Sequence, residues 1–488
     1  MIASQKQEAI YHVWRNESSN ILINAVAGSG KTTTLLQLVE YCRHRTLFVA
    51  FNKSVQEEIQ TRLTDRGLKQ GKAMTIHSLG LKAIKSKYGS VKINNGKNFD
   101  IIKSVQKNNR AIFKTMSWEQ ILKISYTLMD MNDASRLFLS DDLEEIKGYL
   151  LSIGKSFYAS IHIEKLWSEF LVFRKASYEQ RTVEVDFTDM IYLPVYKELH
   201  IPINPYYLMI DEAQDLNLCQ HKLIDNLINQ GTIIKWIAVG DRNQAIYGFS
   251  GASSSSFDMF VQKGNVKELT LDICYRCSTT IIDAANEVYN VMQYSKASPG
   301  KVEIVTSPVK IEPDAMVICR NTEPLVKLFF QLLSLEKSAY IRGDDILNSI
   351  IRFLKPYNSY TADGAKMEML IEMEKLSYDK TEKGRITAFI FKENFSNFKL
   401  LYENLANGYE KVEDLIIKVK NLFKSKKDSI MLCTIHKSKG LEADTVYILN
   451  EKLIPSKFAK SEEQLKQEMN LKYVARTRAK EQLYYLNL

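Results

Sequence analysis

Residues 24–35 read NAVAGSGKTTTL, and this stretch decides the fold. An apolar run at 21–23 precedes it and a helix-forming run at 34–39 follows it, which is the strand–loop–helix context of a phosphate-binding loop. In such a loop, backbone N–H groups line a concavity at a helix N-terminus, a lysine reaches the β- and γ-phosphates, and the next hydroxyl can bind Mg²⁺. Those positions are taken here by Gly28, Ser29, Gly30, Lys31 and Thr32. An ordinary Gly/Ser turn would not require the whole GSGKT string, so we expect the chain to bind a nucleoside triphosphate.

Length and composition indicate a globular protein with more than one domain. The chain has 488 residues, of which 45% are hydrophobic and 25% are charged, and single hydrophobic cores stop growing near about 250–300 residues. The N-terminal segment is too polar for a signal peptide, and no apolar run approaches the roughly 18–20 residues that span a bilayer. We therefore expect a cytoplasmic protein with no membrane partner. The formal net charge of +9 suits a polyanionic partner, although basic proteins commonly carry solvated lysines.

The six cysteines are scattered, and only Cys274 and Cys277 form a CxxC pair. A zinc ribbon needs a second such pair, and thioredoxin chemistry needs its own fold context. Reduced structural thiols are therefore the expected state of these side chains.

An apolar strand at 206–210 ends in two acids, Asp211 and Glu212. This pattern is typical of a site in which the first acid, beside the phosphate loop, holds Mg²⁺ and the second orients a water molecule for attack. A second acid next to the metal ligand favours hydrolysis over transfer to another substrate. The alternative, an acidic N-cap for the following helix, explains one carboxylate but not the pair.

A third apolar strand, 233–241, is followed by Gln244, Tyr247 and Phe249. An amide just past a strand end can respond to the presence of the γ-phosphate. The two rings stand two residues apart on a turn, where they could stack on bases without sequence preference. Taken alone, such aromatic residues are more often part of a core.

Nine segments, in order along the chain, resemble the motifs of superfamily 1A DNA helicases, the UvrD/Rep/PcrA group. They lie between residues 24 and 480 and read AVAGSGKT, VAFNKSVQEEI, TIHSLG, VDFTDMI, MIDEAQD, VGDRNQAIYGFSGA, CYRCS, TIHKSKGLEADTVYIL and NLKYVARTRAK. The resemblance implies an α/β fold with two RecA-like P-loop domains, each with a parallel sheet and a mainly helical insertion. It also implies a bacterial protein, or one that a phage expresses in the host cytoplasm.

The resemblance further implies an ATP and Mg²⁺ site to which both domains contribute. The implied catalytic residues are Lys31, Asp211, Glu212, Gln244, Arg276 and Arg478, with Thr32 and Asp211 as metal ligands. The implied nucleotide-binding residues are Gln7, Ala27, Gly28, Ser29, Gly30, Lys31, Thr32, Thr33, Tyr275, Gly440 and Glu442. Gln5 is an alternative to Gln7 as the side chain that reads the adenine edge. The two arginines match those that reach the γ-phosphate, and such arginines contribute roughly 10³–10⁵ in rate.

The implied DNA-binding residues are Phe51, Asn52, Lys53, His77, Ser78, Tyr247, Phe249, Thr434, His436 and Lys439. The rings match those between which bases stack, and the histidines match contacts to the DNA backbone. The repeated Thr-Ile-His, at 75–77 and 434–436, is what two duplicated domains would produce. A metal site is the other interpretation of these histidines, but no further ligand lies at zinc spacing.

Two positions depart from the usual motifs. Thr33 stands where relatives often have an arginine that packs on adenine, which implies looser base selectivity. Ser250 stands where the usual GFRGA string has its arginine, and the absence of this arginine implies a changed coupling of that motif to DNA. Ala25, by contrast, is ordinary for the helicase form of the loop.

The motifs predict four segments. The first RecA-like domain covers 1–80 and 186–275, with a helical insertion at 81–185. The second covers 276–345 and 428–488, with a reduced helical insertion at 346–427, as in small phage and F-box-type relatives. Strands are expected within AMVICRN, SIMLCTIH, DTVYILN and QLYYLNL of the second domain.

The sequence therefore predicts an ATP-dependent translocase on single-stranded DNA that also unwinds tailed duplex DNA, with 3′ to 5′ polarity by family inference. A translocase that strips proteins from DNA with little unwinding is a variant of this prediction. The alternative from another class is a nucleotide-gated DNA-binding subunit of a repair or defence complex.

Overall fold

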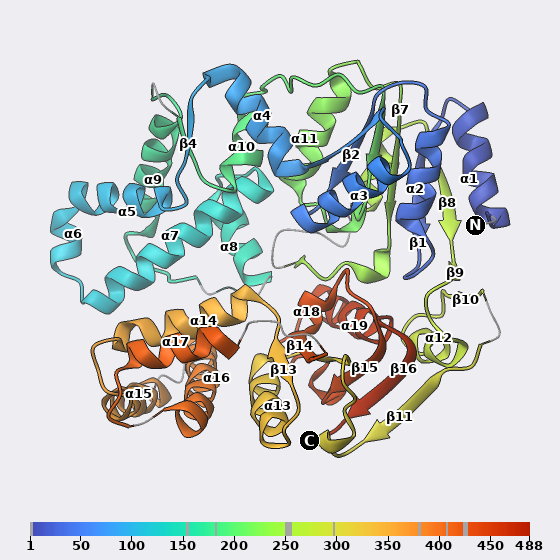
Figure 1. Cartoon of the computed structure of the whole chain (residues 1–488). Coiled ribbons are helices and arrows are strands. Elements are labelled where there is room, and N and C mark those ends of the chain that lie inside the picture. The colour runs from blue at the N-terminus through green and yellow to red at the C-terminus, as the bar shows by residue number, and fades with distance from the viewer. Residues whose placement is uncertain are drawn as a thin grey trace. The chain divides into compact units, whose positions relative to one another are not determined.

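The computed structural model describes residues 3–152, 155, 157–180, 183–248, 256–295, 298–378, 382–406, 408–422 and 428–488. The chain divides into two compact units, Met1–Asp272 with Ser461–Gln467, and Ile273–Lys460 with Glu468–Leu488. Each unit is built on a six-stranded sheet in which every described pairing is parallel (Figure 1). Two parallel-sheet α/β domains confirm the expected RecA-like fold class.

The first sheet has the strand order β3-β2-β6-β7-β1-β8. Its strands are β1 (Asn20–Ala25), β2 (Thr46–Ala50), β3 (Gly71–Thr75), β6 (Tyr207–Ile210), β7 (Lys235–Gly240) and β8 (Val266–Leu271). Its helices are α1 (Gln5–Asn16), α2 (Lys31–Glu40), α3 (Lys53–Asp65), α4 (Ile76–Tyr88), α10 (Asp189–Tyr196) and α11 (Leu218–Asn229). Short 3₁₀ turns follow β6 and β7, at η1 (Ala213–Asp215) and η2 (Arg242–Gln244), and η4 (Asp258–Lys263) precedes β8.

Alternation along the strands explains why helices cover both faces of this sheet. Successive side chains of a strand point to opposite faces. In β1, Ile21 and Ile23 pack with residues of α1, α2 and α3, whereas Leu22 packs with residues of α4, α10 and α11. A parallel sheet buried on both faces requires strands that are apolar throughout, as the runs at 21–23 and 208–210 are.

The segment between α4 and α10 is mainly helical and has a hydrophobic core of its own. It contains α5 (Lys97–Asn108), α6 (Arg110–Lys114), α7 (Trp118–Phe138), α8 (Leu143–Ser152) and α9 (Ile163–Ser177), with a two-stranded parallel ribbon of β4 (Val91–Ile93) and β5 (Val183–Val185). Its core includes Ile101, Leu128, Met131, Leu166 and Phe170, and this cluster is separate from those on the sheet. The expected boundary between residues 80 and 81 falls within α4.

A buried ion cluster joins these helices to the start of α10. The Arg136 guanidinium contacts Asp186 at 2.6 Å and Asp189 at 2.8 Å, and the Lys97 ammonium contacts Asp189 at 2.7 Å. Burial alone would raise the pKa of Asp189, but Arg136 and Lys97 hold it at about 2. Tyr178 also donates a short hydrogen bond to this carboxylate. Both acids belong to the VDFTDMI motif, so this motif anchors the insertion.

The second sheet has the order β11-β16-β15-β12-β14-β13. Its strands are β11 (Lys301–Val305), β12 (Met316–Cys319), β13 (Ala339–Ile341), β14 (Ile430–Thr434), β15 (Ala443–Leu449) and β16 (Ala479–Leu486), and a ribbon pairs β9 (Ile273–Cys274) with β10 (Gln293–Tyr294). Its helices are α12 (Thr279–Asn286), α13 (Thr322–Ser334), α18 (Ile435–Ser438) and α19 (Glu462–Arg476), with short turns η5 (Pro308–Lys310) and η7 (Glu451–Leu453). The four expected strands are confirmed as β12, β14, β15 and β16.

The insertion of the second unit shares one core with its sheet. It contains α14 (Asp344–Leu354), η6 (Lys355–Tyr357), α15 (Ala362–Ser377), α16 (Glu382–Leu405) and α17 (Val412–Leu422). Met369, Phe398 and Leu415 of these helices belong to the same hydrophobic cluster as Phe329 of α13 and Leu432 of β14. The expected boundary between residues 345 and 346 lies within α14.

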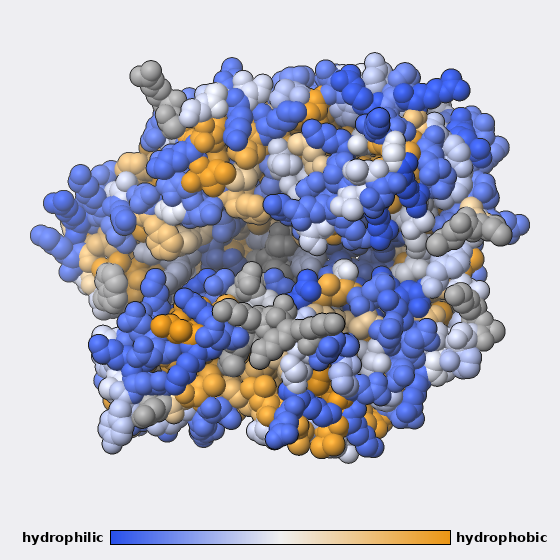
Figure 2. All heavy atoms as spheres, in the orientation of Figure 1, coloured by the Kyte–Doolittle hydropathy of each residue, from blue (hydrophilic) through white to orange (hydrophobic). Residues whose placement is uncertain are grey.

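Hydrophilic side chains cover most of the face that Figure 2 shows, with smaller apolar patches between them. Among the described residues, none of the helices combines the length and the apolar character that crossing a membrane requires.

Candidate functional site

The phosphate loop joins β1 to α2. Gly28 and Gly30 have φ values of 68° and 82°, in the left-handed region that favours glycine. Gly30 is the N-cap of α2 and offers no side-chain hydrogen bond, so the first N–H groups of α2 lack a capping side chain. The Ser29 N–H donates to the Val26 carbonyl at 3.3 Å, which closes the turn. The Ser29 hydroxyl is buried without a hydrogen-bond partner.

The acid pair lies beside this loop. The Thr32 hydroxyl donates to Asp211 Oδ2 at 3.0 Å, and the other oxygen of Asp211 accepts the N–H of Glu212 at 2.9 Å. Glu212 has a φ of 53°, a left-handed backbone conformation at the turn between β6 and η1. Burial and the neighbouring Glu212 raise the pKa of Asp211 to about 6, while Lys31 acts in the opposite direction. The two expected metal ligands, Thr32 and Asp211, are thus in direct contact.

A chain of amides connects Glu212 to the end of β7. Gln214 donates to Glu212 Oε2 at 2.6 Å and accepts the N–H of Asp241 at 3.0 Å. Gln244 in turn donates to Asp241 Oδ2 at 2.7 Å. A Cβ at Gly240 would lie 2.3 Å from the Gln214 side-chain oxygen, so glycine is required for this approach. Sequence reasoning identified Glu212 and Gln244 but missed Gln214 and Asp241, although both lie inside the two quoted motifs.

Gln7 lies against the phosphate loop, whereas Gln5 is exposed. The Gln7 amide donates to the Thr34 hydroxyl at 3.0 Å, and that hydroxyl donates to the Gly30 carbonyl at 2.9 Å. Gln7 also closes a capping box with Ser4 at the start of α1. Ala27 is buried and Thr33 is half-buried in the same region.

Aromatic side chains follow β2, β3 and β7 at the edge of the sheet that also carries the phosphate loop. Phe51 and Tyr247 stack with ring centroids 5.5 Å apart and an interplanar angle of 13°. His77 stacks on Phe187 with centroids 3.8 Å apart. Burial lowers the pKa of His77 to about 4, so this ring is neutral at neutral pH. Phe187 is 59% exposed and was missed, although it stands in the VDFTDMI motif.

The two Thr-Ile-His segments perform the same structural task in the two units. Thr75 is the N-cap of α4, where its hydroxyl accepts the N–H of Ser78 at 3.2 Å. Thr434 is the N-cap of α18 and accepts the N–H of Lys437 at 3.4 Å. Burial, together with the nearby cations, lowers the pKa of His436 to about 3. The repeated motif is therefore a strand-to-helix cap in each domain, and each threonine hydroxyl keeps its own proton for a further acceptor.

Two of the other expected DNA-binding residues also have structural partners. Asn52 is the N-cap of α3 and accepts the N–H of Val55 at 2.9 Å. Lys53 is exposed and forms an ion pair with Glu57 at 3.4 Å. Lys439 follows α18 in the second unit. Phe249 and Ser250 lie outside the described residues.

The second unit holds its expected residues in one local network. Arg276 forms an ion pair with Glu442 at 2.6 Å and donates to the Thr477 carbonyl at 3.3 Å. Arg478 donates to the carbonyls of Val474 and Leu441, at 3.0 and 3.2 Å. Tyr275 is 43% exposed, and Gly440 has a φ of 83°. Burial tends to raise the pKa of Glu442, but Arg276 and Lys480 lower it overall.

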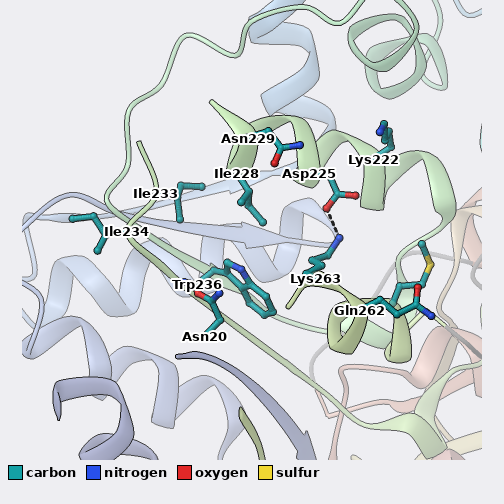
Figure 3. A pocket seen from close by; sticks show the side chains of 11 residues that line it. Asn20, Lys222, Asp225, Ile228, Asn229, Ile233, Ile234, Trp236, Gln262 and Lys263 are labelled. Carbon is teal, nitrogen blue, oxygen red and sulfur yellow. Dashed lines mark hydrogen bonds and ion pairs between the residues drawn. The ribbon is translucent and has the colours of Figure 1, made fainter. Parts of the chain in front are cut away.

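Two cavities of the first unit lie away from the phosphate loop. One, of about 440 Å³, is lined by Trp236 and Asn20 near the start of β7 and β1, where Lys263 faces Asp225 (Figure 3). The other, of about 380 Å³, lies near the start of β2 and β3. The first-unit residues expected to bind nucleotide at the phosphate loop and the acid pair follow the opposite ends of the strands, so neither cavity adjoins them.

Comparison with known proteins identifies similar sequences over most of the chain. The family model for the UvrD/REP helicase N-terminal domain matches residues 3–264, and the model for the UvrD-like helicase C-terminal domain matches residues 350–487. The ATP-dependent DNA helicase Rep of Buchnera aphidicola subsp. Schizaphis graminum is 28% identical over 300 residues, covering 56% of this chain and 43% of that protein. The F-box DNA helicase protein 1 of Schizosaccharomyces pombe is 25% identical over 527 residues, covering 98% of this chain and 57% of that protein. The Rep helicase of Escherichia coli (strain K12) is 26% identical, covering 54% and 40%. The matched part is thus less than two thirds of the length of each of these relatives.

Proposed function

The chain belongs to the UvrD/REP helicase family, and from this premise we propose that it is an ATP-dependent DNA helicase that moves along single-stranded DNA from 3′ to 5′. The observation that carries the proposal is the contact between the two halves of the phosphate site. The Thr32 hydroxyl of the loop donates to Asp211 at 3.0 Å, with Glu212 next to it in the chain. The direction of movement, 3′ to 5′, is inferred from membership of the family.

The residues present fit MgATP. The hydroxyl of Ser29 is buried without a partner, and the uncapped start of α2 offers N–H donors, which suits phosphate oxygens. Thr32 and Asp211 would hold Mg²⁺, which when bound neutralises charge on the β- and γ-phosphates. Among the described residues, no cluster of three or more His, Cys, Asp or Glu side chains could hold a metal ion. The Thr32–Asp211 pair suits Mg²⁺ instead, because Mg²⁺ commonly uses one or two protein ligands together with phosphate oxygens and water.

In this proposal Glu212 orients the attacking water, and the amide chain carries the state of the γ-phosphate onward. Gln214 donates a hydrogen bond to one carboxylate oxygen of Glu212. Gln244, three residues before Tyr247, donates to the carboxylate of Asp241. A shift at the phosphate would therefore be transmitted through Asp241 and Gln244, in the turn after β7, to Tyr247 of the proposed DNA track. Arg276 and Arg478 are proposed to reach the γ-phosphate when the second domain closes on the nucleotide. Each has hydrogen bonds within its own unit, so closure would exchange these partners for phosphate oxygens.

The proposed DNA track uses stacking and backbone contacts. Phe51 and Tyr247 stack on each other, and separation of the two rings would admit a base between them. His77, which is neutral, would donate a hydrogen bond to a phosphate without adding a charge. Lys53 and Lys439 would supply positive charge. In a plot of the logarithm of the DNA-binding constant against the logarithm of the salt concentration, each contact to a phosphate of single-stranded DNA should add about −0.7 to the slope.

ATP hydrolysis measured with and without single-stranded DNA tests the proposal. We expect strong stimulation by DNA and complete loss of turnover in Lys31→Ala, because the lysine contacts the phosphates. An exposed lysine outside the site, as in Lys103→Ala, is the control and should behave like the wild type. Absence of stimulation by any nucleic acid would refute the motor and favour the nucleotide-gated subunit.

Unwinding of duplexes with a 3′ or a 5′ tail tests the direction. We expect unwinding of the 3′-tailed substrate only. Unwinding of the 5′-tailed substrate alone would reverse the assignment. Turnover without unwinding of either substrate would favour a translocase that displaces proteins.

Replacement of Tyr247 tests the DNA track. Tyr247→Ala should reduce DNA-stimulated turnover more than basal turnover, since a stacked base contributes about 1–3 kcal/mol. Tyr126, which is 57% exposed on α7, provides a control as Tyr126→Ala. An equal loss of basal and stimulated turnover in the Tyr247 variant would mean that this ring only stabilises the fold.

A further inference from the structure

Two cysteines flank Arg276 in the turn between β9 and α12. The Cys277 N–H donates to the Cys274 sulfur at 3.4 Å. All six cysteines are free and buried. This pair differs from the other four in that both cysteines belong to one four-residue turn and are joined by an N–H···S hydrogen bond.

The same turn is tied to the segment that carries Arg478. The Thr477 carbonyl accepts Arg276 Nη1 at 3.3 Å and the Cys277 thiol at 4.0 Å. Next to it, the Ser278 N–H donates to the Lys480 carbonyl at 2.8 Å. The Cys277 thiol proton therefore contributes to the position of the loop on which both arginines depend.

We propose that Cys274 and Cys277 are a redox modification site, at which oxidation to an intramolecular disulfide displaces Arg276 and lowers ATP turnover. The effect on turnover rests on the proposed function, whereas disulfide formation does not. A disulfide removes the Cys277 thiol proton and draws together the two residues on either side of Tyr275 and Arg276. The ion pair of Arg276 with Glu442 and its bond to Thr477 belong to the form with two free thiols, so both must adjust when the S–S bond forms.

The thiols also differ chemically from the other buried cysteines. The hydrogen bond from Cys277, with help from neighbouring N–H groups and Arg276, lowers the pKa of Cys274 to about 6. Burial instead raises the pKa of Cys219 and Cys433 to about 12. The thiolate is the nucleophile in disulfide exchange, so Cys274, which is buried in the folded turn, is the expected point of attack once local opening of the turn admits the oxidant.

The reaction needs a small-molecule disulfide as oxidant. The Cys274 thiolate attacks one sulfur of this disulfide, forms a mixed disulfide and releases one thiolate. Cys277 then loses its proton to that thiolate and attacks the Cys274 sulfur, which forms the intramolecular bond and releases the second thiolate. The two cysteines lose two electrons in total, and the small disulfide is reduced to two thiols.

Oxidised glutathione, added to the full-length protein and later reversed with dithiothreitol, tests the inference. Peptide mass spectrometry should show the loss of two hydrogen atoms in the peptide that contains both cysteines, with the other four unmodified. DNA-stimulated ATP turnover should fall at least tenfold and recover on reduction, because an arginine at the γ-phosphate is worth roughly 10³–10⁵ in rate. Cys274→Ser is the control, since it removes the attacking thiolate, and its turnover should not respond to oxidised glutathione.

The possible outcomes separate the two proposals. If the peptide loses no hydrogen atoms, the redox pair is refuted whatever the turnover. If the disulfide forms and turnover changes less than twofold, the link to Arg276 is refuted. If the reduced protein has no turnover with any DNA, the proposed function fails, while the mass spectrum still decides whether the cysteines pair.

Discussion

Replacement of Asp211 with asparagine should stabilise the first unit at alkaline pH while removing ATP turnover. The pKa of Asp211 rises from 3.8 to about 6 because its carboxylate is buried next to Glu212. A folded-state pKa above the unfolded value means that the native state binds the proton more tightly. Stability therefore falls as pH rises from about 4 to 6, and the full cost remains above pH 6. At 1.36 kcal/mol per pH unit, this cost is about 3 kcal/mol.

The asparagine variant removes this charge and can keep a hydrogen bond to Thr32. We expect its free energy of unfolding to exceed that of the wild type by up to about 3 kcal/mol at pH 8 and to equal it near pH 4. Urea unfolding followed by tryptophan fluorescence isolates the relevant unit, because all four tryptophans, at 14, 118, 167 and 236, belong to it. Asp65→Asn, at an exposed carboxylate on α3, is the control and should change stability by less than about 0.5 kcal/mol. A variant that is no more stable than the wild type at pH 8, or equally stabilised at both pH values, would refute the reasoning.

Three further predictions concern other contacts. In Gly240→Ala the new methyl group must displace Gln214, so turnover should fall at least tenfold while the protein stays folded; a wild-type rate would show that the amide chain to Glu212 is not needed. In Thr75→Ala, loss of the N-cap of α4 should lower the free energy of unfolding by about 1 kcal/mol in the urea assay, whereas Thr64→Ala, at an exposed position near the end of α3, should have a smaller effect. In Arg136→Met, Asp186 and Asp189 lose their shared cation, and the free energy of unfolding should fall by about 3–5 kcal/mol; a loss below 1 kcal/mol would mean that Lys97 alone neutralises the pair.

The strands and helices that the sequence predicts are those with strong internal signals. The apolar runs at 208–210 and 316–319 are buried on both faces and were found, as was the helical character of the insertion that contains α7. β11 and β13 were not predicted. Both lie at sheet edges, where Ile304 is 69% exposed and β13 has only three residues, so neither leaves a clear alternation.

The site shows the same division between local pattern and three-dimensional contact. The contact of Thr32 with Asp211 was foreseeable because both follow parallel strands at one sheet edge. The bridge from Gln214 to Asp241 was not, since it depends on the close approach that Gly240 permits. The Thr-Ile-His repeat was interpreted as a DNA contact in duplicated domains, with a metal site as the alternative, although a threonine at a strand end with a helix after it is also a cap signal.

The different cores of the two insertions decide how each part of the chain can vary. The helices between α4 and α10 have a core of their own, and the ion cluster around Asp189 is a main buried polar connection to the sheet. A homologous segment could be grafted there if it kept the arginine and lysine that face Asp186 and Asp189. The helices α14–α17 offer no such seam, because Met369 and Phe398 complete the same core as Phe329. Exchange or shortening of that segment would require simultaneous redesign of α13, so sequence change in these two regions should follow different rules.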